Sequence, residues 1–190
     1  MDPDLEALLD TALIGGREQR PVIIEPYNPL WPEAFTELAV AIQRAVGSRA
    51  LSLDHIGSTS VPGLAAKPII DIVLTVEQVA NESHYLRQLE AAGFTLRVRE
   101  EGHRMFRTPD RAVHLHVFSA GDPAVTNYLD LRDWLRVDAR DRELYASTKK
   151  RLAQRQWPDM NYYAEAKTDV ISRILAHARL WRAGAEVPRD

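Results

Sequence analysis

The sequence predicts an α+β fold in which a β-sheet forms first and a helical segment follows it. Stretches typical of strands gather between residues 51 and 118, whereas residues from 123 onward repeat their apolar positions at helical spacing. With 190 residues, 45% of them hydrophobic, the chain can bury one core of ordinary size. We therefore expect a single domain over residues 21–190, preceded by an N-terminal helical arm over residues 1–20.

The N-terminal part predicts two helices and a short strand. Asp2-Pro3, a leucine repeat and the glycine pair at 15–16 are typical of a short amphipathic helix. The apolar run at 22–24 favours a short strand. A second helix follows, which ends at Gly47 and whose apolar positions recur at helical spacing, namely Phe35, Leu38, Ile42 and Val46.

The middle of the chain predicts five strands and one helix. Residues 68–76 form a nearly continuous apolar run, which is typical of a strand that is buried on both faces at the centre of a sheet. Residues 94–99 alternate between apolar and polar side chains, so we expect a half-exposed strand there, after a helix that ends at Gly93. The other strand candidates are residues 51–56, 104–107 and 112–118.

The C-terminal third predicts helices. Two apolar stripes recur at helical spacing, one formed by Tyr128, Leu131 and Leu135 and one by Tyr163, Val170, Ile174 and Trp181. The tryptophans Trp134, Trp157 and Trp181 fit core packing, or else a surface through which two copies form a homodimer.

Charge and composition argue against several classes of function. The formal net charge of −3 and the pI of about 6.1 provide no global field for nucleic acid. The absence of cysteine excludes disulfides, thiolate zinc sites and a cysteine nucleophile. No stretch has the length and apolarity of a membrane span, and the N-terminus lacks the pattern of a secretion signal. We expect a cytoplasmic protein without a membrane partner.

The first candidate site is the loop Gly57-Ser58-Thr59-Ser60, which lies between two predicted strands. Glycine allows close backbone approach, and hydroxyl and amide groups can bind phosphate oxygens. The same tetrapeptide also fits an ordinary polar connection. It is neither a P-loop, which needs Gly-Lys-Ser/Thr, nor a Gly-x-Gly-x-x-Gly dinucleotide motif.

Asp71 interrupts the apolar strand at 68–76. A carboxylate among branched apolar side chains must pair, protonate or bind a cation. It therefore indicates either a salt bridge, to Lys67 or an arginine, or a divalent cation such as Mg²⁺ or Mn²⁺ that bridges to phosphates. Strand alternation places position 73 on the same face, where Val73 cannot supply a second metal-binding carboxylate.

His114 and His116 share one face of the strand predicted at 112–118. Two imidazoles at this spacing can contact a metal or a phosphate, and together with His55 they could line one cleft. The alternative is that each histidine is a hydrogen-bonded core residue or a surface residue.

Lysine is rare in this chain, which has only four lysines among its 24 basic residues. Two of them occur in Tyr-x-x-x-Lys units, Tyr145 to Lys149 and Tyr163 to Lys167, whose spacing places ring and ammonium on one helical face. Each unit could bracket a base and its phosphates, or could pair a core tyrosine with a solvated lysine. Arg132 and Arg136 could likewise grip a phosphate or form surface ion pairs.

These motifs, in this order, resemble the GrpB family, and the resemblance spans about residues 22–178. It is carried by the two Tyr-x-x-x-Lys units and by residues 25–31 (EPYNPLW), 55–64 (HIGSTSVPGL), 66–72 (AKPIIDI), 114–117 (HLHV) and 132–136 (RDWLR). The resemblance implies a nucleotidyltransferase-like mixed β-sheet with flanking helices. A related domain fused to dephospho-coenzyme A kinase in some bacteria implies a link to nucleotide or coenzyme A metabolism.

The resemblance also implies roles for individual residues. Gly57 and Ser58 would hold phosphate, and Asp71 would bind the cation, whereas the second and third carboxylate positions of the superfamily fall on Val73 and His116. The resulting candidate set has Asp71 and His116 as catalytic and metal-binding residues. The candidate substrate-binding residues are His55, Gly57, Ser58, Thr59, Ser60, Lys67, His114, Arg132, Arg136, Tyr145, Lys149, Tyr163 and Lys167.

Three functions remain open at this stage. The first is metal-dependent nucleotidyl transfer from a nucleoside triphosphate to an unknown hydroxyl or phosphate acceptor. The second is a catalytically silent module that binds a nucleotide and assists a partner enzyme, for example in coenzyme A metabolism. The third, a structural partner-binding domain, leaves the loop and the buried aspartate unexplained.

Overall fold

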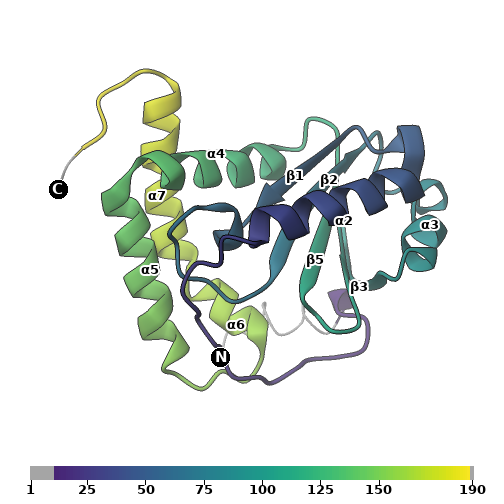
Figure 1. The fold of residues 1–190 in the computed structure, drawn as a ribbon, viewed down its shortest axis with the longest axis horizontal. Helices are drawn as coiled ribbons and strands as arrows, with labels where there is room; N and C mark the ends of the chain where they lie inside the picture. The colour runs from purple at the N-terminus through teal and green to yellow at the C-terminus, as the bar shows by residue number, and fades with distance from the viewer. Residues whose placement is uncertain (1–10, 189–190) are drawn as a thin grey trace.

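A five-stranded mixed sheet forms the centre of the computed structural model, which describes residues 11–188 (Figure 1). The strands lie in the order β1-β2-β5-β4-β3, so β5 holds the centre and β2 lies next to it. The strand bounds are Ser52–Ile56 for β1, Ile70–Val76 for β2, Thr95–Glu100 for β3, His103–Arg107 for β4 and Val113–Ser119 for β5. The α+β prediction is therefore confirmed.

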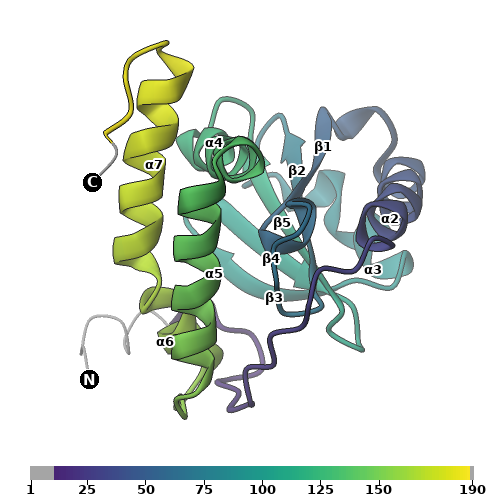
Figure 2. The ribbon, with the colours of Figure 1, turned by 60° about the vertical axis from the view of Figure 1, so that its left-hand side comes forward.

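Helices cover both faces of the sheet, as Figure 2 shows. One side carries α2 and α3, and the other carries the helical C-terminal third. The bounds are Trp31–Val46 for α2, Leu86–Ala91 for α3, Pro123–Val137 for α4, Ala139–Ala153 for α5, Met160–Glu165 for α6 and Thr168–Arg182 for α7. Short 3₁₀ helices occupy Gly47–Arg49, Ser58–Ser60 and Glu82–His84.

The apolar run of β2 reflects this double cover. Ile72 and Leu74 are fully buried in the core that α2 and α3 complete, whereas Val73 packs on the opposite face with Ile56 and Phe118, below α4. A strand with apolar neighbours on both faces needs no polar alternation. Asp71, near the start of β2, is the exception that the sequence predicted to be functional.

The pairing of β2 with β5 is parallel, whereas the other three strand pairs are antiparallel. Parallel neighbours require a crossover connection, and the chain makes it through α3 and the β3–β4 hairpin. The register sets Asp71 opposite His114 and Val73 opposite His116.

The helical third has its own core, in which α4, α5 and α7 pack on the segment after the 3₁₀ turn at Ser58–Ser60. Its buried residues are Val61, Leu64, Trp134, Leu135, Tyr145, Ala146, Ile174 and Ala178. Asp122, Asp138 and Asp159 cap the N-termini of α4, α5 and α6 through their side chains. The stripe predicted from Tyr163 to Trp181 is divided between α6 and α7, because the chain breaks its helix at Ala166 and Lys167.

Two strand predictions need correction. Residues 22–24 form no strand, and the chain makes only an isolated bridge between Glu25 and Ala66, because Pro26 follows directly and has no N–H to extend the ladder. β3 keeps the predicted exposure at Thr95 and Arg99 and departs from the alternation at Arg97, whose side chain is buried. A bulge shifts the register between Leu96 and Val98, and the N-terminal segment covers this strand.

The N-terminal helix predicted up to residues 15–16 lies mostly outside the described residues, and only its end, at Thr11 and Ala12, is helical in them. In the described part of the chain, no helix has both the length and the apolarity to cross a membrane.

Arg97 fastens the N-terminal segment to the sheet. Its guanidinium donates to the backbone oxygens of Ile14 and Gly16, and the backbone of Ile14 donates to the Arg97 oxygen at 2.9 Å. A buried guanidinium with two carbonyl partners is worth more than an exposed ion pair, because removal of the charge leaves both oxygens unpaired.

We expect Arg97→Leu to lower the free energy of unfolding by about 1–3 kcal/mol and to expose residues 11–20 to limited proteolysis. Arg99→Leu on the same strand is the matched control. It breaks an exposed ion pair with Glu82 and should cost about 1 kcal/mol or less, measured by urea unfolding. Equal losses in the two variants would contradict this role of Arg97.

Candidate functional site

A cavity of about 670 Å³ lies between the sheet and the helical third. Its walls come from the loop after β1, from β2 and β5, from α4 to α7, and from the segment at 18–25. Of the predicted site residues, the cavity brings together Gly57, Ser58, Thr59, Lys67, Asp71, His114, His116, Arg132, Tyr145, Lys149, Tyr163 and Lys167.

His55 does not line this cavity, so the expected cleft of three histidines is wrong. Its side chain lies on the other face of the sheet, stacked on Phe35 with ring centroids 4.8 Å apart. Its Nε2 lies 3.0 Å from Thr59 Oγ1, which donates to the Ile69 carbonyl. Burial lowers the pKa of His55 to about 4, so the imidazole is neutral and supports the loop from behind.

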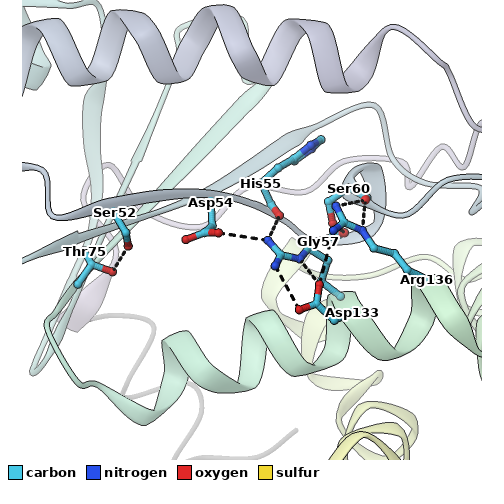
Figure 3. A network of polar contacts seen from close by, with 9 residues as sticks. Ser52, Asp54, His55, Gly57, Ser60, Thr75, Asp133 and Arg136 are labelled. Atoms are coloured by element: carbon cyan, nitrogen blue, oxygen red, sulfur yellow. Dashed lines mark hydrogen bonds and ion pairs between the residues drawn. The ribbon is translucent and has the colours of Figure 1, made fainter. Parts of the chain in front are cut away.

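Ser60 and Arg136 also lie outside the cavity and hold the loop in place (Figure 3). Arg136 donates twice to the Ser60 carbonyl, at 3.1 and 2.9 Å, and Ser60 Oγ donates to the Gly57 carbonyl at 2.6 Å. Arg132 fixes the preceding strand, since its guanidinium contacts Asp54, the His55 carbonyl and Asp133. These two arginines therefore position the loop from the α4 side.

Gly57 packs directly on Asp71. The residue has φ 68° and ψ −172°, a conformation that side-chain-bearing residues rarely adopt. A Cβ at this position would overlap the Asp71 carboxylate and would lie 3.0 Å from Asp71 Cβ. Glycine is required here for a close approach of backbone to carboxylate, and that approach orients the Asp71 side chain.

Asp71, His114 and His116 form a candidate metal centre on the cavity wall. One ligand atom of each residue lies within 4.8 Å of the other two, and the strand register explains this because His114 pairs with Asp71 and His116 is two residues further along β5. His114 Nδ1 is 3.3 Å from Asp71 Oδ1. The partner of Asp71 is therefore a histidine, not the lysine or arginine that the salt-bridge alternative assumed.

The electrostatics keep this group ready for a cation. Burial is the largest single influence and acts to raise the pKa of Asp71, but His114, through its hydrogen bond and charge, together with His116 and Lys67, holds that pKa below its usual value. Burial lowers the pKa of His116 to about 3. An ionised carboxylate beside a neutral imidazole matches the chemistry of a divalent metal ligand set.

Two residues next to the candidate metal centre were not predicted from the sequence, Glu100 and His103 of the β3–β4 hairpin. His103 Nε2 lies 3.0 Å from His116 Nδ1, and His103 Nδ1 lies 3.0 Å from Glu100 Oε2. The only sequence signal was a histidine next to a predicted strand, and its contact with His116 depends on the antiparallel pairing of β4 with β5. That pairing could not be read from spacing.

Three lysines, Lys67, Lys149 and Lys167, also line the cavity. Lys149 on α5 donates to Ser58 Oγ at 2.7 Å and to the Ala65 carbonyl at 2.5 Å. Lys67 and Lys167 both face the ring of Tyr163, with Nζ 5.2 and 4.8 Å from its centroid. Burial lowers the pKa of each of these lysines, and that of Lys149 falls to about 7. Such a group of desolvated cations has the chemistry to bind an anion.

Tyr163 lies between the two lysines and is fully buried. Its hydroxyl oxygen has no hydrogen-bond partner among the described residues. Tyr145, the other predicted ring, contacts Lys149 at 4.7 Å from its centroid. The two Tyr-x-x-x-Lys units therefore converge on one cavity from different helices.

The fold is that of the nucleotidyltransferase-like class. The crystal structure of a GrpB protein from Enterococcus faecalis superposes with a TM-score of 0.74 at 32% identity, over 84% of this chain and 99% of the other. The poly(U) polymerase Cid1, solved with Mg 3′-dATP, gives 0.50 at 17% identity, over 69% of this chain and 43% of the polymerase, a likeness of fold alone.

The chain itself belongs to the GrpB family, because the family model described as "GrpB protein" matches residues 21–177. A UPF0157 protein of Streptomyces coelicolor is 49% identical over 87% of this chain and 89% of its own length. A dephospho-CoA kinase of Mycolicibacterium paratuberculosis is 31% identical over 77% of this chain, which matches only 43% of the kinase. The resemblance inferred from the motifs is confirmed.

We expect Gly57→Ala to lower the free energy of unfolding by about 1–3 kcal/mol and to displace the Asp71 carboxylate. Gly63→Ala is the matched control, since Gly63 has a similar positive φ of 78° but no atom within 4 Å of an added Cβ. Both variants suffer backbone strain, whereas only Gly57→Ala should also weaken divalent-metal binding, measured by calorimetry. Unchanged metal affinity in Gly57→Ala would contradict the orienting role.

Proposed function

We propose that the chain binds a nucleotide through its phosphates together with a divalent cation. The observation that carries the proposal is that one cavity brings candidate metal ligands together with several lysines. Asp71, His114 and His116 offer metal ligands on β2 and β5, and Lys67 and Lys167 both lie near the ring of Tyr163. A metal-bound polyphosphate carries negative oxygens that can bind both the metal and the lysines.

The size and charge of the cavity support this ligand class. A volume of about 670 Å³ falls within the usual range for small-molecule sites. Buried ammonium groups with lowered pKa values are stabilised in their charged form by a bound anion, which repays part of their desolvation. Tyr145 and Tyr163 also line the cavity, and their rings supply an apolar surface for a base or another group.

We extend the proposal to nucleotidyl transfer, in which a hydroxyl or phosphate oxygen of an unknown acceptor attacks the α-phosphorus of a nucleoside triphosphate and pyrophosphate leaves. A bound cation would neutralise charge on the reacting phosphate. Lys67, Lys149 and Lys167 would bind the other phosphate oxygens. The Gly57-Ser58 loop would position the triphosphate. Cytoplasmic nucleotide pools would supply the substrate.

One observation favours a second candidate, a silent nucleotide-binding module. Val73 occupies the position of the second carboxylate, and it is fully buried between Ile56 and Phe118 with no access to the cavity. A two-metal transfer site needs a ligand there. The similarity to the kinase of Mycolicibacterium paratuberculosis suggests coenzyme A metabolism as the setting for such a module.

Titration with nucleoside triphosphates and coenzyme A precursors tests the site. A ligand at about a hundred times its Kd should stabilise the fold by about 2.7 kcal/mol and raise the thermal midpoint, more so with a divalent cation present. Asp71→Asn should lose the metal-dependent part, whereas Asp169→Asn, an exposed aspartate in the first turn of α7, should behave as wild type. The absence of a shift with every ligand would reject the nucleotide site.

Affinity for the phosphates should depend on pH through Lys149. Burial first, then repulsion from Lys167, lowers the pKa of Lys149 to about 7, while Asp71 acts in the opposite direction. A bound phosphate favours the charged ammonium, so affinity is highest below pH 7 and falls above it.

We expect the Kd to rise by up to about tenfold per pH unit between pH 7 and 9, measured by calorimetry. Lys149→Met should bind weakly with a flatter profile, and exposed Lys150→Met should keep the wild-type profile. A wild-type affinity that stays constant over this range would exclude Lys149 from phosphate binding.

A further inference from the structure

We infer that Asp71, His114 and His116 bind a nitrogen-preferring transition-metal cation, typified by Zn²⁺, in preference to Mg²⁺, and that Glu100 and His103 position His116 for that metal. The inference specifies the cation of the proposed function and rests on the same cavity. It does not depend on which phosphorylated molecule the lysines hold.

The donor set decides the class of metal. Two of the three ligands, His114 and His116, are imidazoles, and only Asp71 supplies oxygen. Mg²⁺ prefers an octahedral shell of oxygen atoms, whereas imidazole suits Zn²⁺, Fe²⁺, Ni²⁺ and Cu²⁺. A donor set of one carboxylate and two imidazoles therefore favours such a metal over Mg²⁺.

The spacing fits a small coordination shell. Bonds of about 2.0–2.1 Å at tetrahedral angles place neighbouring ligand atoms roughly 3.3 Å apart. Asp71 Oδ1 and His114 Nδ1 are already separated by 3.3 Å, and the whole group spans no more than 4.8 Å. A metal held by these three side chains, all of which line the cavity, would have a further coordination position available to an anion.

The hairpin determines which nitrogen of His116 is free. Burial opposes ionisation of Glu100, but its hydrogen bond with His103 is the larger influence and lowers the pKa of Glu100, so this carboxylate only accepts. His103 Nδ1 lies at hydrogen-bond distance from it, and an imidazole that donates from Nδ1 in its uncharged form accepts at Nε2. His116 Nδ1–H donates to that atom, and His116 Nε2 keeps its lone pair for a metal.

Aromatic packing fixes the orientation of this relay. The His103 ring stacks on Phe118 with centroids 4.7 Å apart, and on His116 at 5.3 Å. Tyr128 of α4 contacts the His116 ring from another side, at 5.7 Å. A metal-binding histidine usually donates the N–H of its other ring nitrogen to a neighbouring group. Loss of that neighbour lowers metal affinity about 10- to 100-fold.

Calorimetric titration of the full chain, first stripped with a chelator, measures the preference with Zn²⁺ and Mg²⁺ alone as probes. We expect one Zn²⁺ per chain, bound at least about tenfold more tightly than Mg²⁺. His116→Ala and Asp71→Asn should abolish this binding, whereas His84→Gln, a histidine outside the cavity, should not. Stronger binding of Mg²⁺, or no Zn²⁺ binding, would overturn the inference.

The positioning role has its own test. His103→Phe keeps the stacking on Phe118 but removes the acceptor, and it should weaken Zn²⁺ about 10- to 100-fold. His103→Gln restores an acceptor for His116 Nδ1–H and should recover most of the affinity. Equal affinities in His103→Phe and wild type would reject the role, provided that circular dichroism shows both folded.

A double variant separates this inference from the proposed function. Lys67→Met with Lys167→Met should lose nucleotide binding and keep Zn²⁺ binding, because neither lysine is a metal ligand. If the protein binds a nucleotide without a metal and does not bind Zn²⁺, only the metal inference is rejected. If it binds Zn²⁺ but no nucleotide, the proposed function is rejected and the metal centre is kept.

Discussion

The parallel pairing of β2 with β5 is the constraint on which the candidate site depends. It fixes Asp71 beside His114, and the alternation of β5 then brings His116 to the same face. No other pairing in the sheet connects these residues. A register slip of one residue would turn the Asp71 carboxylate toward α2 and bury it in the main apolar core. The register that buries the apolar side chains of β2 is therefore also the register that places the candidate metal ligands.

The side of the cavity formed by α5 depends on Lys149, which joins two parts of the chain that are far apart in sequence. Its ammonium bonds the hydroxyl of Ser58 and the carbonyl of Ala65, so α5 is attached to the loop that follows β1. A buried lysine in this role carries a desolvation penalty, which its two hydrogen bonds and the ring of Tyr145 offset in part. Lys149 thus helps to shape the cavity and also belongs to the surface that we propose to bind an anion.

The sequence predicts the fold and most of the cavity because these depend on local periodicity. Alternation places His114 and His116 on one face, and a charge in an apolar run singles out Asp71. Contacts between distant segments cannot be derived from local periodicity. The contact of His103 with His116, and the approach of Lys67 and Lys167 to the same ring of Tyr163, were therefore not predicted. His55 was misplaced for the same reason, since the face that it occupies depends on how β1 meets β2.

The attachment of the N-terminal segment to Arg97 has a consequence for the molecule in solution. β3 is the last strand of the sheet, and an uncovered last strand offers unpaired N–H and C=O groups to any other extended chain. The bridge between Leu13 and Val98 and the hydrogen bond from Ile14 occupy part of that edge with the protein's own backbone. A buried arginine on β3 therefore protects the sheet against edge-to-edge aggregation.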